Sequence, residues 1–187
     1  MRMFVAAVPP ESVLEDLEDF LSVRREAAAF RWTVPDQWHL TLAFLADVPD
    51  RAYDDLAARL ERAARKRRTM RATVTGGGAF PNVHRAKVLW AGVDLDDPEE
   101  LRRLATGSRA AAAKAGIEVA GERFRPHLTL ARMGHHPVET TSWVLLLDGY
   151  RGPAWDLDEI TLIASHLGEG PRKRPRYEVL ETFPLGG

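Results

Sequence analysis

Cysteine is absent from this sequence of 187 residues. The chain can therefore form neither disulfide bonds nor thiolate metal sites, which fits a reducing compartment. Long apolar runs are missing as well, because none approaches the roughly 18 residues of a membrane span. The apolar run at residues 3–8 is too short for the core of a signal peptide and is ended by Pro9 and Pro10. We therefore expect a cytoplasmic protein with no membrane partner.

Excess charge of either sign is also missing, since 26 Lys and Arg residues nearly balance 27 Asp and Glu residues. This balance argues against a protein that coats nucleic acid by bulk electrostatics, so a nucleic-acid substrate would need a local basic cleft. With 45% hydrophobic residues, the chain is long enough for one substantial core and too short to require two independent domains. We expect a single domain over residues 1–187, and a monomer.

The sequence does contain an alternation of strand and helix patterns. Apolar and β-compatible runs predict strands at residues 3–8, 38–45, 71–75, 88–93, 124–133, 145–150, 159–165 and 177–183. Apolar positions at helical spacing predict a helix that opens at Pro10 and Glu11, a second at 50–68, and a third from 98 to about 115. The glycines at 76–78 predict a turn after the third strand.

Two landmarks recur at one shared offset. The helix start at Pro10 returns 88 positions later at Pro98, and the tetrapeptide His-Leu-Thr-Leu that begins at His39 begins again, also 88 positions later, at His127. One offset for a helix start and a tetrapeptide indicates two copies of a strand-helix-strand unit. The predicted fold class is therefore α+β, built from duplicated strand-helix-strand units.

Each copy of the tetrapeptide places an imidazole beside a hydroxyl. Side chains alternate along a strand, so His39 and Thr41 share one face, as do His127 and Thr129, while the leucines point the other way. If a pseudo-twofold axis relates the repeats, the two polar pairs face each other across a groove. Packing explains the leucines but leaves the polar face free, so the duplicated pair favours a functional site over an ordinary polar strand surface.

This pairing suits an in-line displacement at phosphorus. One neutral imidazole takes a proton from the attacking water, the other, protonated, gives one to the leaving ribose oxygen, and the threonine hydroxyls donate to phosphate oxygens. An unperturbed imidazole pKa of about 6.5 makes both forms accessible near neutral pH. The chemistry needs no metal and no cofactor, and the symmetric spacing does not say which histidine is the donor.

The chain resembles the two-histidine phosphoesterase superfamily, and within it the RNA 2′,3′-cyclic phosphodiesterases once described as 2′-5′ RNA ligases. The resemblance covers nearly the whole chain and is carried by residues 2–6, 39–45, 78–81, 88–90 and 124–132. It implies a bilobal domain with antiparallel-rich sheets around a central cleft. It also implies a hydrolase, an RNA 2′,3′-cyclic 3′-phosphodiesterase that leaves a 2′-phosphate, with His39 as proton donor and His127 as proton acceptor.

Four further residues are candidates for substrate binding. The family places an arginine at the position of Arg132 near the phosphate. Arg132 lies at odd spacing from His127, so a bulge or a strand end is needed to turn it towards the groove. Phe4 is either a core residue or a stacking surface for a terminal base. Tyr177 and Ser165 resemble family positions that line the cleft.

Two basic segments are less specific signals. Residues 62–71 are rich in arginine but lie where a helix is predicted to end, a place that favours solvated cations. Arg172, Lys173, Arg174 and Arg176 precede a predicted cleft strand, where they would contact phosphates of a longer RNA without reading its bases. The expected partner is thus RNA with a 2′,3′-cyclic phosphate end, or a related nucleotide.

Other functions stay open at this point. The same cleft would suit an ADP-ribose cyclic phosphate, a cyclic dinucleotide or a 2′-5′ linkage, and the reaction would also run in reverse as a ligation. A non-catalytic RNA-end binding module is disfavoured because both histidines and both threonines are present. A zinc site at His39 and His127 is disfavoured because His-x-Thr pairs lack the carboxylate of a typical hydrolytic zinc site.

Overall fold

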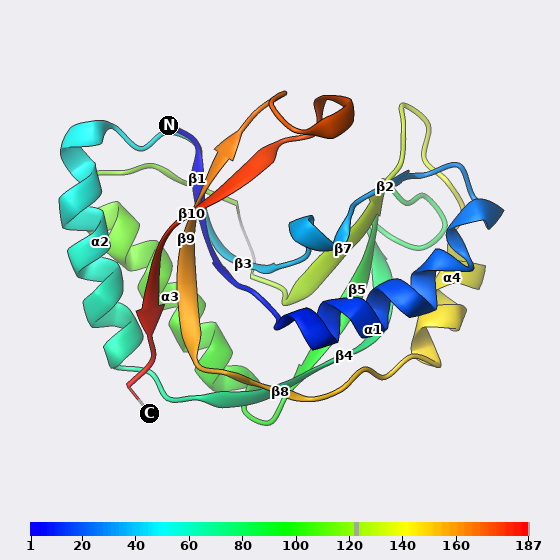
Figure 1. The fold of residues 1–187 in the computed structure, drawn as a ribbon, viewed down its shortest axis with the longest axis horizontal. Coiled ribbons are helices and arrows are strands. Elements are labelled where there is room, and N and C mark those ends of the chain that lie inside the picture. Colours follow the sequence, from blue (N-terminus) through cyan, green and yellow to red (C-terminus); the bar gives the residue numbers. More distant parts are fainter. Residues whose placement is uncertain (122–123, 187) are drawn as a thin grey trace.

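The computed structural model describes residues 1–121 and 124–186, and in this part of the chain the strands form two five-stranded antiparallel sheets (Figure 1). Sheet A has the strand order β10-β9-β1-β3-β6, with bounds β1 (Met3–Ala7), β3 (Leu40–Leu45), β6 (Val119–Ala120), β9 (Glu159–His166) and β10 (Arg176–Pro184). Sheet B has the order β2-β7-β5-β4-β8, with bounds β2 (Arg31–Trp32), β4 (Met70–Phe80), β5 (Val88–Leu95), β7 (His127–Arg132) and β8 (Trp155–Leu157). The predicted α+β class with antiparallel-rich sheets is confirmed.

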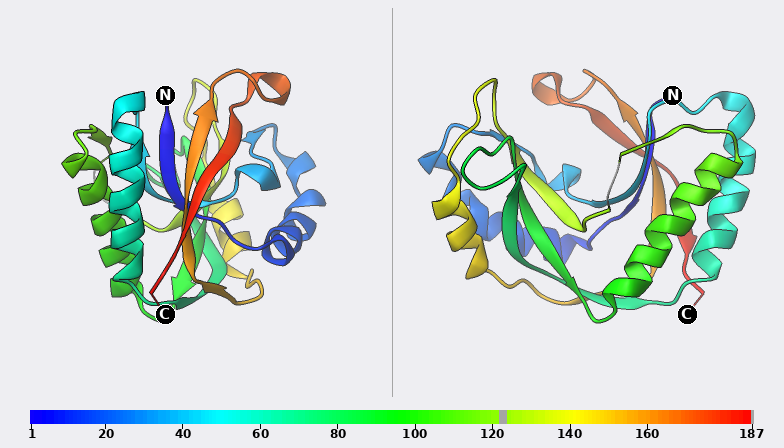
Figure 2. Two further views of the ribbon diagram at one scale, coloured as in Figure 1. Left: turned by 60° about the vertical axis from the view of Figure 1, so that its left-hand side comes forward. Right: turned by 180° about the vertical axis from the view of Figure 1, so that it is seen from behind.

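The helices cover the outer faces of the two sheets. Their bounds are α1 (Glu11–Ser22), α2 (Asp50–Arg65), α3 (Pro98–Lys114) and α4 (Thr141–Asp148), and short 3-10 helices lie at Arg25–Ala27, Pro35–Gln37 and Pro171–Lys173. Helices α2 and α3 pack on sheet A, and together with that sheet they form what we call lobe A. Helices α1 and α4 lie on sheet B and form lobe B with it (Figures 1 and 2). Among the described residues, no helix is long and apolar enough to cross a membrane.

The two repeats exchange helices between the lobes. Helix α1 follows a strand of sheet A but lies on lobe B, where the Tyr150 hydroxyl donates to Asp16 over 2.6 Å and the Phe20 and Tyr150 rings are 4.7 Å apart. Helix α3 follows a strand of sheet B but packs on lobe A (Figure 2). Each lobe is therefore built from both halves of the chain.

Sheet A has two different faces. Val5, Leu42 and Leu162 belong to the main core beneath α2 and α3, as expected from alternation along a strand. Phe4 and its neighbours on the opposite face form a separate small cluster. That second face looks into the space between the lobes, so one strand contributes both to the core and to the site.

The predicted strand at residues 145–150 is wrong, because these residues belong largely to α4. The continuous apolar run from Trp143 to Leu147 has no clear period of two or of 3.6 residues, so the pattern does not separate strand from helix. In the fold, Leu147 is fully buried while Leu145 is 65% exposed. The helix resolves the run into a buried face and a solvated face.

The predicted turn at Gly76–Gly78 is also wrong, since β4 continues through these glycines to Phe80. The β4–β5 register shifts between Val74 and Gly77, and Gly76 has a φ of 68°. A Cβ at Gly77 would come 2.7 Å from the Trp90 carbonyl oxygen, and one at Gly78 would overlap the Trp90 indole. A bulge and the close approach of Trp90 explain the glycines.

Candidate active site

A cleft of about 420 Å³ opens between the lobes and is lined by both His-x-Thr motifs. His39 directly precedes β3 in sheet A, and Thr41 follows inside that strand. His127 and Thr129 lie in β7 of sheet B. The two polar pairs expected to face each other across a groove thus line one cleft from different sheets.

A bulge in β7 turns Arg132 into the cleft. Thr129 and Ala131 pair with consecutive residues of β5, so Leu130 is an extra residue in this strand. Leu130 and Ala131 are both buried in the core, and the alternation of side chains resumes one position later. Arg132 therefore lines the cleft together with His127 despite the odd spacing between them.

Strand β3 has the same bulge at the equivalent position. Thr41 and Ala43 pair with consecutive residues of β1, which leaves Leu42 as the extra residue. The residue that corresponds to Arg132 is Phe44, and the guanidinium of Arg2 lies 4.4 Å from the centroid of its ring. Each motif strand thus has an arginine beside it, and the sequence pattern did not reveal Arg2 because only the fold stacks it on Phe44.

His39 is held among aromatic rings. The Phe4 ring stacks on the imidazole at 4.4 Å and 21°, and the Tyr177 ring meets it edge-on at 5.5 Å. Phe4 is only 3% exposed, a position that favours orienting His39 over stacking with a substrate base. Ser165, opposite Tyr177 in sheet A, is buried but also lines the cleft. The substrate-binding roles of these residues stay predictions.

His127 has a matching environment in lobe B. The Phe80 ring meets it at 5.1 Å and 90°, and the Trp90 ring lies 6.1 Å away. Its Nδ1 lies 2.7 Å from the carbonyl oxygen of Arg125, and because a carbonyl can only accept, Nδ1–H is the donor. In neutral His127 the nitrogen left to accept a proton is therefore Nε2.

Burial sets the charge state of both imidazoles. It lowers the pKa of His39 to about 4, against a smaller opposing effect from a hydrogen bond to the Gln37 backbone, and His127 lowers it further. Burial also lowers the pKa of His127, where the Arg125 carbonyl opposes the shift and the charge of Arg132 adds to it. In each motif the opposing backbone group lies two residues before the histidine. In the protein alone both imidazoles are neutral near pH 7, and a bound anion would raise both pKa values.

The cleft concentrates positive charge that the chain as a whole lacks. Among the described residues that line it there is no carboxylate, and there are six cations: Arg2, Arg31, Arg132, Arg172, Lys173 and Arg174. No group of three or more His, Asp or Glu side chains able to hold a metal ion occurs in the described part of the chain. The site is therefore suited to anions.

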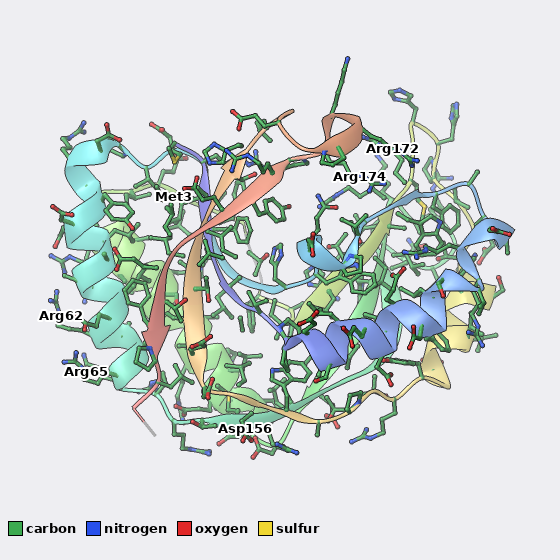
Figure 3. All side chains as sticks on the ribbon, viewed as in Figure 1. Met3, Arg62, Arg65, Asp156, Arg172 and Arg174 are labelled. Carbon is green, nitrogen blue, oxygen red and sulfur yellow. The ribbon has the colours of Figure 1, made fainter. Side chains whose placement is uncertain are left out.

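Half of these cations come from the loop between β9 and β10 at the mouth of the cleft. Figure 3 shows Arg172 and Arg174 on this loop. Arg172 and Lys173 have φ values of 55° and 61°, a backbone conformation that costs energy for residues other than glycine and often marks a functional segment. Arg176, which the sequence predicts to contact phosphates together with them, forms an ion pair with Glu169 instead and does not line the cleft.

Thr33 connects the two motifs through hydrogen bonds. Its hydroxyl accepts from the Trp38 indole over 2.8 Å, next to His39. The same hydroxyl lies 2.7 Å from the Thr129 carbonyl and 2.9 Å from the Leu130 carbonyl, to which it can donate, at the bulge of β7. Sequence reasoning missed Thr33, since no local pattern marks a hydroxyl that bridges two sheets.

Comparisons with known proteins place the chain in a family. The family model described as LigT like Phosphoesterase matches residues 8–90 and 93–172. The RNA 2′,3′-cyclic phosphodiesterase of Thermus thermophilus is 33% identical over 193 residues, which cover 100% of this chain and 91% of the relative. The corresponding protein of Aquifex aeolicus is 30% identical over 188 residues, with coverages of 100% and 98%.

Solved structures extend the likeness to the fold. A crystal structure of a protein from Thermus thermophilus has a TM-score of 0.79 and 32% identity, and the match covers 100% of this chain and 99% of the other. Escherichia coli LigT complexed with 3′-AMP has a TM-score of 0.77 and 25% identity, with coverages of 100% and 98%. The resemblance inferred from the motifs is confirmed, and the chain belongs to the LigT-like phosphoesterase family.

Proposed function

We propose that this protein hydrolyses the 2′,3′-cyclic phosphate end of an RNA to a 2′-phosphate, by acid–base catalysis between His39 and His127 without a metal ion. The observation that carries the proposal is the symmetry of the site. Two histidines on different sheets line one cleft that is rich in cations, and each has a backbone hydrogen bond to the residue two positions before it. That arrangement supports two proton transfers at one bound phosphate.

The reaction follows from these positions. Nε2 of His127 takes a proton from water as the water oxygen bonds to phosphorus, and the bond from phosphorus to the 3′-oxygen breaks as His39 protonates that oxygen. Thr41 and Thr129 donate to the non-bridging oxygens, and Arg132 balances their charge. The direction of proton transfer is the one the family resemblance implies. It is compatible with the neutral form of His127, in which burial, with an added contribution from the charge of Arg132, holds this imidazole.

His39 is the more demanding half of the mechanism. With a pKa of about 4 it carries no proton near neutral pH in the protein alone. The negative charge of a bound cyclic phosphate raises the pKa of a nearby imidazole, so substrate binding would bring the proton with it. Substrate binding would thus protonate His39, the proton donor.

The cations support an RNA substrate. A cyclic phosphate carries one negative charge, whereas the cleft presents six cations, so charge is left over for phosphates further along a chain. The curated relatives are named RNA 2′,3′-cyclic phosphodiesterases, and a LigT structure was solved with 3′-AMP. A ribonucleotide end in the cleft accounts for both the motifs and the charge.

Turnover of a short RNA ending in a 2′,3′-cyclic phosphate tests the proposal. We expect a 2′-phosphate product and a turnover rate that excess chelator does not change. In His39→Ala and in His127→Ala, kcat should fall by about 100-fold or more. His136→Ala, which removes an exposed histidine, is the matched control and should keep wild-type turnover.

Three results would contradict the proposal. Near-normal turnover in either histidine variant would contradict the acid–base mechanism. Loss of activity with chelator would contradict catalysis without a metal ion. A 3′-phosphate product would overturn the regiochemistry. Running the same assay on a cyclic mononucleotide, a cyclic dinucleotide and a 2′-5′ linked dimer ranks the substrates.

A further inference from the structure

A second groove of about 490 Å³ lies between α2 and α3, and we call it the outer groove. Small residues contribute to its lining, among them Ala63 and Gly107, where a Cβ added to Gly107 would lie 3.7 Å from that of Ala63. The two helices can therefore approach closely, while long side chains form the walls. Figure 3 shows Arg62 on the outer side of α2, away from the catalytic cleft.

The walls are strongly basic. Among the described residues that line the outer groove, Glu99 is the one carboxylate, and the seven cations are Arg59, Arg62, Lys66, Arg67, Arg102, Arg103 and Lys114. Cations this close repel one another unless an anion balances their charge. Such a local excess of positive charge is unusual in a chain with a net charge of −1.

Ion pairs within the fold balance only part of this charge. Arg59 pairs with Asp55 on its own helix, and Arg102 pairs with Glu99. Two further arginines share the single carboxylate of Glu100 at 3.6 Å each. In the described residues no ion pair includes the remaining three cations, namely Arg62, Lys66 and Lys114. These three are available to an external anion.

The shape of the charged surface favours a strand of phosphates over a single phosphate group. The cations on α2 and directly after its end extend from residue 59 to 67, and those on α3 extend from 102 to 114, about 18 Å at 1.5 Å per residue. Two rows of cations of this length on either side of a groove match several consecutive phosphates of one nucleic-acid strand.

Sheet A separates the outer groove from the catalytic cleft. Leu56 and Leu104 of the two helices share the main core with Val5, on the helix side of β1. Phe4, next to Val5, is on the other side and contacts His39. An RNA end in the cleft can reach the outer groove only if the chain continues around an edge of sheet A, which a dinucleotide is too short to do.

We propose that the outer groove is a second RNA-binding site, which holds backbone phosphates of the substrate remote from its cyclic-phosphate end. The naming of RNA as the polyanion rests on the proposed function. The groove itself rests on charge and shape alone. The protein then uses one site for chemistry and another for the body of a longer RNA.

The direct test is a binding measurement with the triple variant Arg62→Gln, Lys66→Gln and Lys114→Gln. Within the described part of the chain, these residues form no ion pair and do not line the catalytic cleft, so the variant removes no charged contact between described residues. The probe is a fluorescent RNA of roughly 30 nucleotides with a 3′-hydroxyl end, which gives the enzyme nothing to hydrolyse. We expect Kd to rise about tenfold at low salt and the slope of log Kd against log salt to fall by about 2, near 0.7 per lost phosphate contact.

A second triple variant controls for total charge. Arg51→Gln, Arg85→Gln and Lys87→Gln remove three exposed cations that line neither groove and form no ion pair with another described residue. This control should bind the RNA as wild type does. Equal weakening in both triple variants, or unchanged Kd and salt slope in the first, would overturn the proposal.

Activity separates this proposal from the proposed function. In the first triple variant, kcat/KM for a dinucleotide ending in a 2′,3′-cyclic phosphate should stay at the wild-type value, while KM for the longer RNA with the same end rises. If the wild type hydrolyses neither substrate, the proposed function fails while the binding result still reports on the outer groove. Weaker binding of ATP with unchanged binding of RNA would assign the groove to small polyphosphates and overturn the RNA assignment.

Discussion

At the scale of single residues, one extra residue in a strand decides which side chain reaches the cleft. Without the bulge at Leu130, alternation would turn Arg132 away from His127 and into the core. With it, two core residues follow each other and the guanidinium enters the cleft. There its charge adds to the effect of burial, and both lower the pKa of His127.

Arg132→Gln should therefore change both rate and pH dependence. Loss of a charge-assisted contact worth about 1.5–3 kcal/mol lowers kcat/KM by about 10- to 100-fold. The pKa of His127 should rise, because a positive charge beside it is gone, and the corresponding inflection in the pH profile of kcat/KM moves to higher pH. Arg125→Gln is the control, since its exposed side chain does not line the cleft and its backbone carbonyl remains. A pH profile unchanged in Arg132→Gln would show that the charge of Arg132 does not act on His127.

At the scale of elements, the two motif strands are joined by more than the core. Thr33 belongs to the segment between β2 of sheet B and the 3-10 helix before β3. Its hydroxyl receives the indole N–H of Trp38 and contacts the carbonyls of Thr129 and Leu130. The position of His39 is thus tied to the bulge that orients the opposite motif.

Thr33→Val should expose this connection. The indole N–H of Trp38, whose side chain is 1% exposed, would lose its acceptor, at a cost of about 1–3 kcal/mol in the free energy of unfolding. We also expect kcat to fall several-fold, because His39 follows Trp38 directly. Thr33→Ser keeps the hydroxyl and should stay within about 1 kcal/mol of wild type. The free energy of unfolding in urea and kcat are measured for both variants. Equal values for Thr33→Val and Thr33→Ser would show that the Thr33 hydroxyl does not connect the two motifs.

At the scale of the whole molecule, the exchange of α1 and α3 means that both halves of the chain build the two lobes on either side of the cleft. Both lobes contain helices from both repeats, so neither sheet is covered without the other half of the chain. In the folded chain each histidine is enclosed by aromatic rings of its own sheet, and this burial lowers the pKa values of both. Folding is thereby linked to pH.

The sign of this linkage follows from the protons bound. Between pH 6.5, the ordinary pKa of a histidine in an unfolded chain, and about 4, the pKa of His39 in the folded protein, the unfolded chain binds more protons than the native one. The free energy of unfolding should therefore fall as pH drops through this window, by up to ~3 kcal/mol from His39. His39→Gln should flatten the pH dependence measured by urea unfolding, whereas His136→Gln, at an exposed position, should not. An identical slope in His39→Gln and wild type would contradict the linkage.

Much of the site could be predicted from local pattern. The two tetrapeptides at one offset, together with strand alternation, placed His39, Thr41, His127 and Thr129 on cleft faces, because the period of a strand is a property of the backbone alone. Helix starts at Pro10 and Pro98 were equally local, and the α+β class followed from the order of the elements. The odd spacing of Arg132 also indicated that a bulge or a strand end would be needed there.

Other features depend on which segments meet in space. The run at residues 145–150 became part of a helix because packing of Leu147 against β4 chose between two conformations that the apolar run allows equally. Arg2 and Thr33 entered the site only because Phe44 and the β7 bulge lie beside them. The sequence by itself determined the chemical groups and the faces they occupy. The tertiary structure decided their neighbours, and hence their pKa values and the charge of the cleft, because burial and Coulomb interactions depend on distance in space and not along the chain.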